Sequence, residues 1–111
     1  MKLHDEKIDD VLVIRIDEEE INVHNANNLA DHFDKVLQDG HTKIVVNFQN
    51  VNFIDSSGIA VIIDLLRQLK EIKGKLRIFQ LNRRVKALFE VTKTHALMDI
   101  HPTQADALEN F

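Results

Sequence analysis

The residues with the clearest capacity for chemistry are Asp55, Ser56, Ser57 and Gly58, which stand between two apolar stretches. The first stretch is typical of a strand and the second of a helix, whose first turn carries unpaired N–H groups and a partial positive charge. A serine there caps a donor, and it can also carry a phosphoryl group without disrupting the fold. Asp55 is suited to accept hydrogen bonds from the turn, and Gly58 to let a partner's backbone or a γ-phosphate approach closely. The same residues are also typical of an ordinary helix cap and turn.

Short runs of β-branched and other apolar residues predict the strands around this segment. The predicted strands are 11–16, 43–48, 75–81 and, with weaker patterns, 21–23 and 97–100. A further extended stretch, 51–54, leads directly to Asp55.

Amphipathic spacing predicts helices between these strands. The first begins after Asn25, a candidate N-cap, and ends before Gly40. The second spans 57–73 and ends at Gly74, a shorter third is capped by Asn82, and 103–111 forms a terminal helical segment. The apolar face of the second helix comprises Ile59, Ile62, Ile63, Leu66, Leu69 and Ile72.

The flank of that apolar face lies next to Ser57. Helical spacing places most of Ile59, Val61 and Leu65 in the core. One or two of them are suited to the apolar part of a partner surface beside Ser57.

Strands that alternate with amphipathic helices predict an α/β layer structure with a mostly parallel sheet. Binding sites in such sheets lie at the carboxyl ends of the strands. The stretch 55–58 stands at such an end, so the sequence predicts a functional site there.

The composition predicts one domain over residues 1–111, with a formal charge of −4 and no cysteine, tyrosine or tryptophan. Without cysteine there are no disulfides or thiolate metal sites. The basic residues form no long run, and aromatic stacking platforms are absent, so nucleic acid is an improbable partner class. We expect a cytoplasmic protein that does not insert into a membrane, because no signal peptide or membrane-spanning run is recognisable.

Other chemistries lack their motifs. The six histidines show no ligand spacing, and no phosphate-loop, dinucleotide or hydrolase motif is present. Asp9 and Asp10 precede the strand 11–16, whereas the paired acids of response-regulator receivers follow their first strand. No histidine near Ser57 in sequence could act as its general base. The sequence therefore gives no support to a metal site, a cofactor or an enzymatic activity.

The pattern apolar-Asp-Ser-Ser-Gly-apolar at a strand-to-helix junction resembles the STAS domain, and in particular the bacterial anti-sigma factor antagonists. The resemblance covers essentially the whole chain and is strongest over 43–92. It implies a single α/β STAS domain over 1–111, with a mixed four- to five-stranded β-sheet flanked by amphipathic helices.

The resemblance also implies a function. In this family the unphosphorylated protein binds an anti-sigma factor that is also a serine kinase, and this binding releases the sigma factor. The kinase phosphorylates the second serine of the motif, which matches Ser57, and a serine phosphatase restores the original form. The motif and partner-binding positions would then be Asp55, Ser56, Gly58, Ile59 and Asn22, with Ser56 pointing inward or bracing the turn.

Two departures from the family pattern leave alternatives open. Asn22 stands where relatives often have an acid, and 91–93 replaces a common Leu-Thr-Gly. A phosphorylation-independent STAS subunit of a signalling or lipid-transport assembly is the first alternative. A small enzyme or nucleotide-binding protein is the second, and tight stoichiometric uptake of ATP or GTP would favour it.

Overall fold

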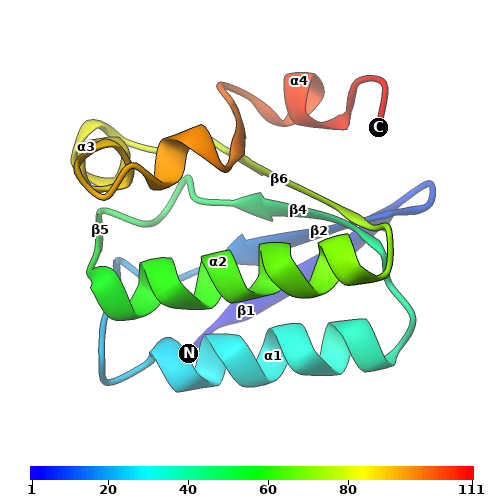
Figure 1. The fold of residues 1–111 in the computed structure, drawn as a ribbon, viewed down its shortest axis with the longest axis horizontal. Coiled ribbons are helices and arrows are strands. Elements are labelled where there is room, and N and C mark those ends of the chain that lie inside the picture. The colour runs from blue at the N-terminus through cyan, green and yellow to red at the C-terminus, as the bar shows by residue number, and fades with distance from the viewer.

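The chain folds into two β-sheets and four α-helices, as a computed structural model of residues 1–111 shows (Figure 1). The elements in chain order are β1 Leu3–Ile8, β2 Val11–Ile16, β3 Glu20–Ile21, α1 Ala26–Gln38, β4 Lys43–Asn47, β5 Phe53–Ile54, α2 Ser56–Glu71, β6 Lys75–Phe79, α3 Arg83–Val91, a 3-10 helix Thr94–Ala96, β7 Asp99–His101 and α4 Gln104–Leu108. None of the helices combines the length and apolar character that a membrane span requires.

The main sheet is mixed, with the strand order β1-β2-β4-β6-β7. Only β1 runs antiparallel to its neighbour, and β2, β4, β6 and β7 are mutually parallel. A separate parallel pair, β3-β5, lies where the chain enters α2. The predicted α/β class and mixed sheet are confirmed.

The strand β1 was not predicted from the sequence. Its residues, LHDEKI, are mostly charged and exposed, so they show no apolar run. The strand forms because its backbone pairs with β2 across a two-residue turn, and its charged residues protect the exposed edge of the sheet.

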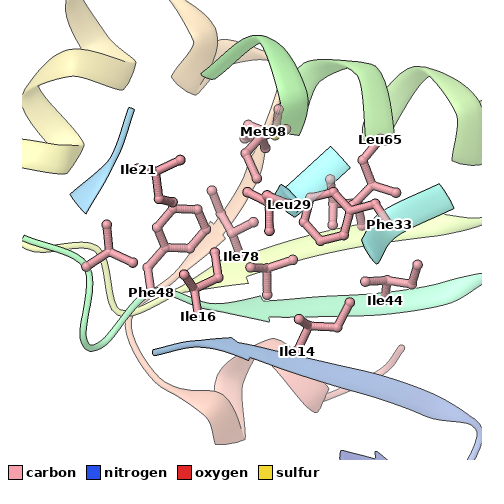
Figure 2. Close-up of a cluster of buried hydrophobic side chains, with 14 of the residues drawn as sticks. Ile14, Ile16, Ile21, Leu29, Phe33, Ile44, Phe48, Leu65, Ile78 and Met98 are labelled. Carbon is pink, nitrogen blue, oxygen red and sulfur yellow. The ribbon is translucent and has the colours of Figure 1, made fainter. Parts of the chain in front are cut away.

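The core lies between the sheet and the helices α1 and α2 (Figure 2). Successive side chains of a strand point to opposite faces of the sheet. Leu12, Ile14 and Ile16 therefore point toward the helices, whereas Val11 and Val13 join a smaller cluster under α4. Because both faces of β2 are buried, its sequence is almost continuously apolar.

The buried face of α2 differs from the predicted stripe. Leu65 is fully buried, whereas Ile63 and Leu66 are only partly buried and Ile72 is 51% exposed. The helix is apolar over more than half its circumference, so spacing alone does not determine which side faces the sheet. Packing against α1 and β6 sets this direction.

The opposite face of the sheet is covered by α4 and the C-terminal residues. Arg77 on β6 donates hydrogen bonds to the carbonyl oxygens of Ala107 (3.0 Å) and Asn110 (3.1 Å). Its guanidinium also lies 4.5 Å from the centre of the Phe111 ring. The terminal helical segment predicted from the sequence is thus confirmed and held by one arginine.

Replacement of Phe48 by alanine is expected to lower the free energy of unfolding by about 3–5 kcal/mol. Phe48 is fully buried and meets Phe89 edge to face, with ring centres 6.2 Å apart. Phe53→Ala is the matched control, because Phe53 is 36% exposed, and should cost clearly less than Phe48→Ala. Urea unfolding measures both variants, and equal losses would contradict the assigned core.

Candidate functional site

The helix α2 begins at Ser56, and Asp55 is its N-cap. The Oδ1 atom of Asp55 accepts hydrogen bonds from the backbone N–H groups of Ser57 (2.9 Å) and Gly58 (3.3 Å). Its Oδ2 atom accepts a third, from Val23 N–H at 3.2 Å. The predicted role of Asp55 is confirmed, but the helix starts one residue earlier than predicted. The cap is therefore the aspartate and not a serine.

Long-range backbone pairing places this cap. The strands β3 and β5 lie side by side, and the N–H of Asp55 donates to the carbonyl oxygen of Ile21 at 2.9 Å. Two segments far apart in sequence thus meet at the start of α2.

Asn22 and Asn25 shape the segment that faces the cap. Asn25 occupies the N-cap position of α1, as predicted, but its side chain makes no capping bond. Its Nδ2 donates instead to the carbonyl of Glu20 (2.8 Å), and its Oδ1 accepts from Asn22 N–H (2.9 Å). The Oδ1 of Asn22 accepts from His24 N–H at 2.9 Å. Asn22 therefore orders the turn that brings Val23 to Asp55.

The two serines differ in exposure. Ser56 is exposed and Ser57 is half-buried at the second position of α2. The expectation that Ser56 points inward is wrong, because the inward direction at the start of α2 is taken by Gly58 and Ile59. Both hydroxyl groups are accessible at the surface of the junction.

Gly58 is required by packing inside the protein. A Cβ atom at this position would lie 2.6 Å from Cγ1 of Ile54 and 2.7 Å from Cγ2 of Ile21. The glycine therefore lets α2 approach β3 and β5, whereas the sequence analysis had assigned its space to a partner. Ile59 is 3% exposed and packs in the core, so the apolar part of a partner surface must come from other residues.

A groove of about 530 Å³ lies beside the cap, between the start of α2 and the helix α3. It is lined by Phe53, Asp55, Ser56, Arg84, Ala87, Leu88 and Val91. The guanidinium of Arg84 lies 5.3 Å from the centre of the Phe53 ring. We name this feature the α3 groove.

The sequence analysis missed the α3 groove. A signal was available, because Arg84, Leu88 and Val91 follow one another at i, i+4 and i+7 and so share one helix face. The spacing alone does not show that this face of α3 lies opposite Phe53 and the start of α2.

Asn82 holds α3 against the junction. Its Oδ1 accepts from Val85 N–H at 2.9 Å, which confirms the predicted cap. Its Nδ2 donates to the carbonyl oxygens of Val51 and Asn52, both at 3.2 Å. One side chain therefore fixes the start of α3 to the chain that immediately precedes Phe53, and both α3 and Phe53 line the α3 groove.

Shifted pKa values belong to residues outside the cap and the α3 groove. A hydrogen bond from Lys43 lowers the pKa of Asp10, and one from Arg15 lowers the pKa of Asp17. Asp10 lies in the β1–β2 turn, at the end of the sheet opposite to the start of α2 (Figure 1). The sequence argument that Asp9 and Asp10 stand at the wrong end for a receiver pocket is confirmed.

Comparison with known proteins identifies the family. The geometry defines an α/β domain with a mixed sheet and an Asp-Ser-Ser-Gly segment at a capped strand-to-helix junction. The family model of the STAS domain matches residues 2–107 of this chain. The chain is 30% identical over 104 residues to a candidate anti-sigma factor antagonist of Thermotoga neapolitana, covering 93% of this chain and 92% of that protein. It is 30% identical over 82 residues to the anti-sigma-B factor antagonist of Staphylococcus aureus, covering 74% and 76%.

A solved structure supports the same assignment. The crystal structure of a candidate anti-sigma factor antagonist from Thermotoga maritima has a TM-score of 0.91 to this chain at 26% identity, covering 96% of this chain and 92% of that one. The chain belongs to the STAS domain family, as its resemblance in sequence implied.

Asp55→Ala is expected to lower the free energy of unfolding by about 1–2 kcal/mol, because the first turn of α2 loses its cap. Asp55→Asn should cost less, since its single carbonyl oxygen keeps part of the bonding. Asp64→Ala, an exposed aspartate within α2, is the control and should stay within about 0.5 kcal/mol of wild type. Urea unfolding gives all three values, and an Asp55→Ala variant as stable as the control would refute the capping role.

Gly58→Ala is expected to be destabilising. Overpacking costs about 1–3 kcal/mol, whereas alanine gains at most about 1 kcal/mol of helix propensity over glycine. Thermal and urea unfolding measure the net loss. Unchanged or increased stability in this variant would show that Ile21 and Ile54 yield to the added methyl group.

Proposed function

We propose that this protein is an anti-sigma factor antagonist, whose unphosphorylated form binds an anti-sigma factor with serine kinase activity and releases the sigma factor. Phosphorylation of Ser57 switches this binding off, and a serine phosphatase restores it. The observation that carries the proposal is the accessible Ser57 at the capped start of α2, beside exposed apolar side chains. The names of the relatives from Thermotoga neapolitana and Staphylococcus aureus support the same class of function.

The position of Ser57 suits a switch that leaves the fold intact. The kinase would transfer the γ-phosphoryl group of ATP to Ser57 Oγ, with release of ADP and a proton. A phosphoserine carries about −1.5 to −2 charges, and a helix N-terminus favours negative charge by about 0.3–1 kcal/mol. The Asp55 carboxylate already accepts from the Ser57 and Gly58 amides. The added charge therefore falls mainly on the molecular surface and not on the helix.

The free-energy cost of this charge arises in the complex. An unpaired dianion that a partner buries costs several kcal/mol. A cost of about 4 kcal/mol would weaken binding roughly a thousandfold. Such a difference in affinity is large enough for the protein to exchange partners without a change of fold.

The protein would act in the cytoplasm as a substrate and binding partner of enzymes. An ATP-dependent kinase and its phosphatase would act on it in the cytoplasm. In this scheme the protein supplies a substrate serine and a binding surface, and the kinase supplies the catalysis.

Ser57→Glu is expected to weaken binding to the cognate anti-sigma factor kinase at least tenfold, because it adds a carboxylate at the proposed phosphorylation site. Isothermal titration with the purified kinase and ADP measures the affinity. Ser57→Ala should bind like wild type but take up no phosphate when ATP is supplied, as intact mass shows. Ser56→Ala is the matched control and should still gain one phosphate.

Three results would contradict the proposal. These are an unchanged affinity of Ser57→Glu, a phosphate located on Ser56, or no kinase from the same genome that binds the wild-type protein. An unmodified mass in both growing and stressed cells would favour the phosphorylation-independent STAS subunit of a signalling or lipid-transport assembly.

A further inference from the structure

We infer that the α3 groove is the specificity-determining half of the partner surface. It receives an apolar side chain of the anti-sigma factor, while Arg84 pairs with an acidic side chain of the same partner segment. This inference rests on the proposed function and adds the chemistry by which the partner is recognised.

Exposed apolar side chains gather at this end of the molecule. Five large apolar residues are substantially exposed, namely Val23, Phe53, Ile72, Val91 and Leu97. Phe53 and Val91 line the α3 groove, and Val91 is the most exposed of the five at 78%. Val23, which is 65% exposed, is bonded through its N–H to Asp55. Two of the five therefore line the groove next to the proposed phosphorylation site and a third lies on the turn bonded to its cap, which is an arrangement expected of an apolar interface core.

Arg84 gives this apolar surface a defined charge preference. Its guanidinium lies against the Phe53 ring and has no carboxylate within 4.0 Å, whereas Arg15 and Arg77 each pair with an aspartate. An arginine stacked on an aromatic ring is common at energetic hot spots, because its planar fork binds a carboxylate in two places. Asp55 lines the same groove, but its oxygens are hydrogen-bonded to three backbone N–H groups and it forms no ion pair with Arg84. The complementary partner group is an acid.

The α3 groove is already formed in the free protein. Asn82 bonds the first turn of α3 to the chain immediately before Phe53, and the lining residues of α3 share one helix face. A partner segment therefore binds without first ordering this surface, which lowers the entropic cost of association.

The α3 groove also couples binding to the proposed switch. Ser56 lines it, and Ser57 is the next residue. A phosphate on Ser57 would repel an incoming carboxylate and compete for Arg84, so one modification weakens the partner's ion pair in two ways.

The test compares Arg84→Glu with Arg83→Glu. Both reverse one exposed arginine in the first turn of α3, but only Arg84 lines the groove. The probe is the purified cognate anti-sigma factor kinase with ADP, titrated calorimetrically. We expect Arg84→Glu to weaken binding at least tenfold and Arg83→Glu by less than threefold.

A second pair tests the apolar half of the surface. Val91→Asp introduces a charge into the groove, and Ile72→Asp introduces the same charge at the far end of α2. We expect at least a tenfold loss for Val91→Asp and less than threefold for Ile72→Asp. Both positions are exposed, so thermal unfolding should show all four variants folded.

The outcomes separate this inference from the proposed function. If Ser57→Glu loses binding while Arg84→Glu and Val91→Asp bind like their controls, the α3 groove is overturned and the switch stands. If wild type binds no kinase, or Ser57→Glu binds unchanged, the proposed function fails. Selective losses at Arg84 and Val91 support the inference.

Discussion

The capping of α2 by Asp55 is the interaction on which the architecture of the site depends. One carboxylate accepts backbone hydrogen bonds from Ser57, Gly58 and Val23, so it joins the start of the helix to the turn after β3. The absence of a Cβ at Gly58 then lets the helix approach Ile21 and Ile54. Together these contacts set where α2 begins, and thereby which serines reach the surface.

The same capping makes the stability of α2 independent of the proposed modification at Ser57. Because Asp55 already satisfies the first amides of α2, the helix does not need a phosphate or a serine hydroxyl for its stability. A charge added at Ser57 would therefore change the folding free energy little, but it would weaken binding where a partner buries it. Under the proposed function, the protein would change its binding without changing its fold.

The α3 groove arises where two segments that are remote in sequence meet, namely 53–56 and 84–91. Asn82 joins α3 to the chain before β5, and Arg84 lies over Phe53. The exposed Phe53 and Val91 cannot be explained by core packing, whereas neighbouring Phe89 is fully buried. An apolar lining with one unpaired cation suits a partner segment that combines an apolar and an acidic side chain.

Local chemistry in the sequence determined most of the elements and the centre of the site. The β-branched runs of β2, β4 and β6, the amphipathic pattern of α2, the cap at Asn82 and the hydrogen bonds that Asp55 accepts from its turn were all predicted, because each depends on neighbouring residues. Tertiary structure decided the rest. The charged strand β1 exists because β2 offers it hydrogen bonds, and Ser56 is exposed because Gly58 and Ile59 take the inward positions. The α3 groove depends on contacts such as that between Asn82 and Val51, 31 residues apart, which spacing along a chain does not encode.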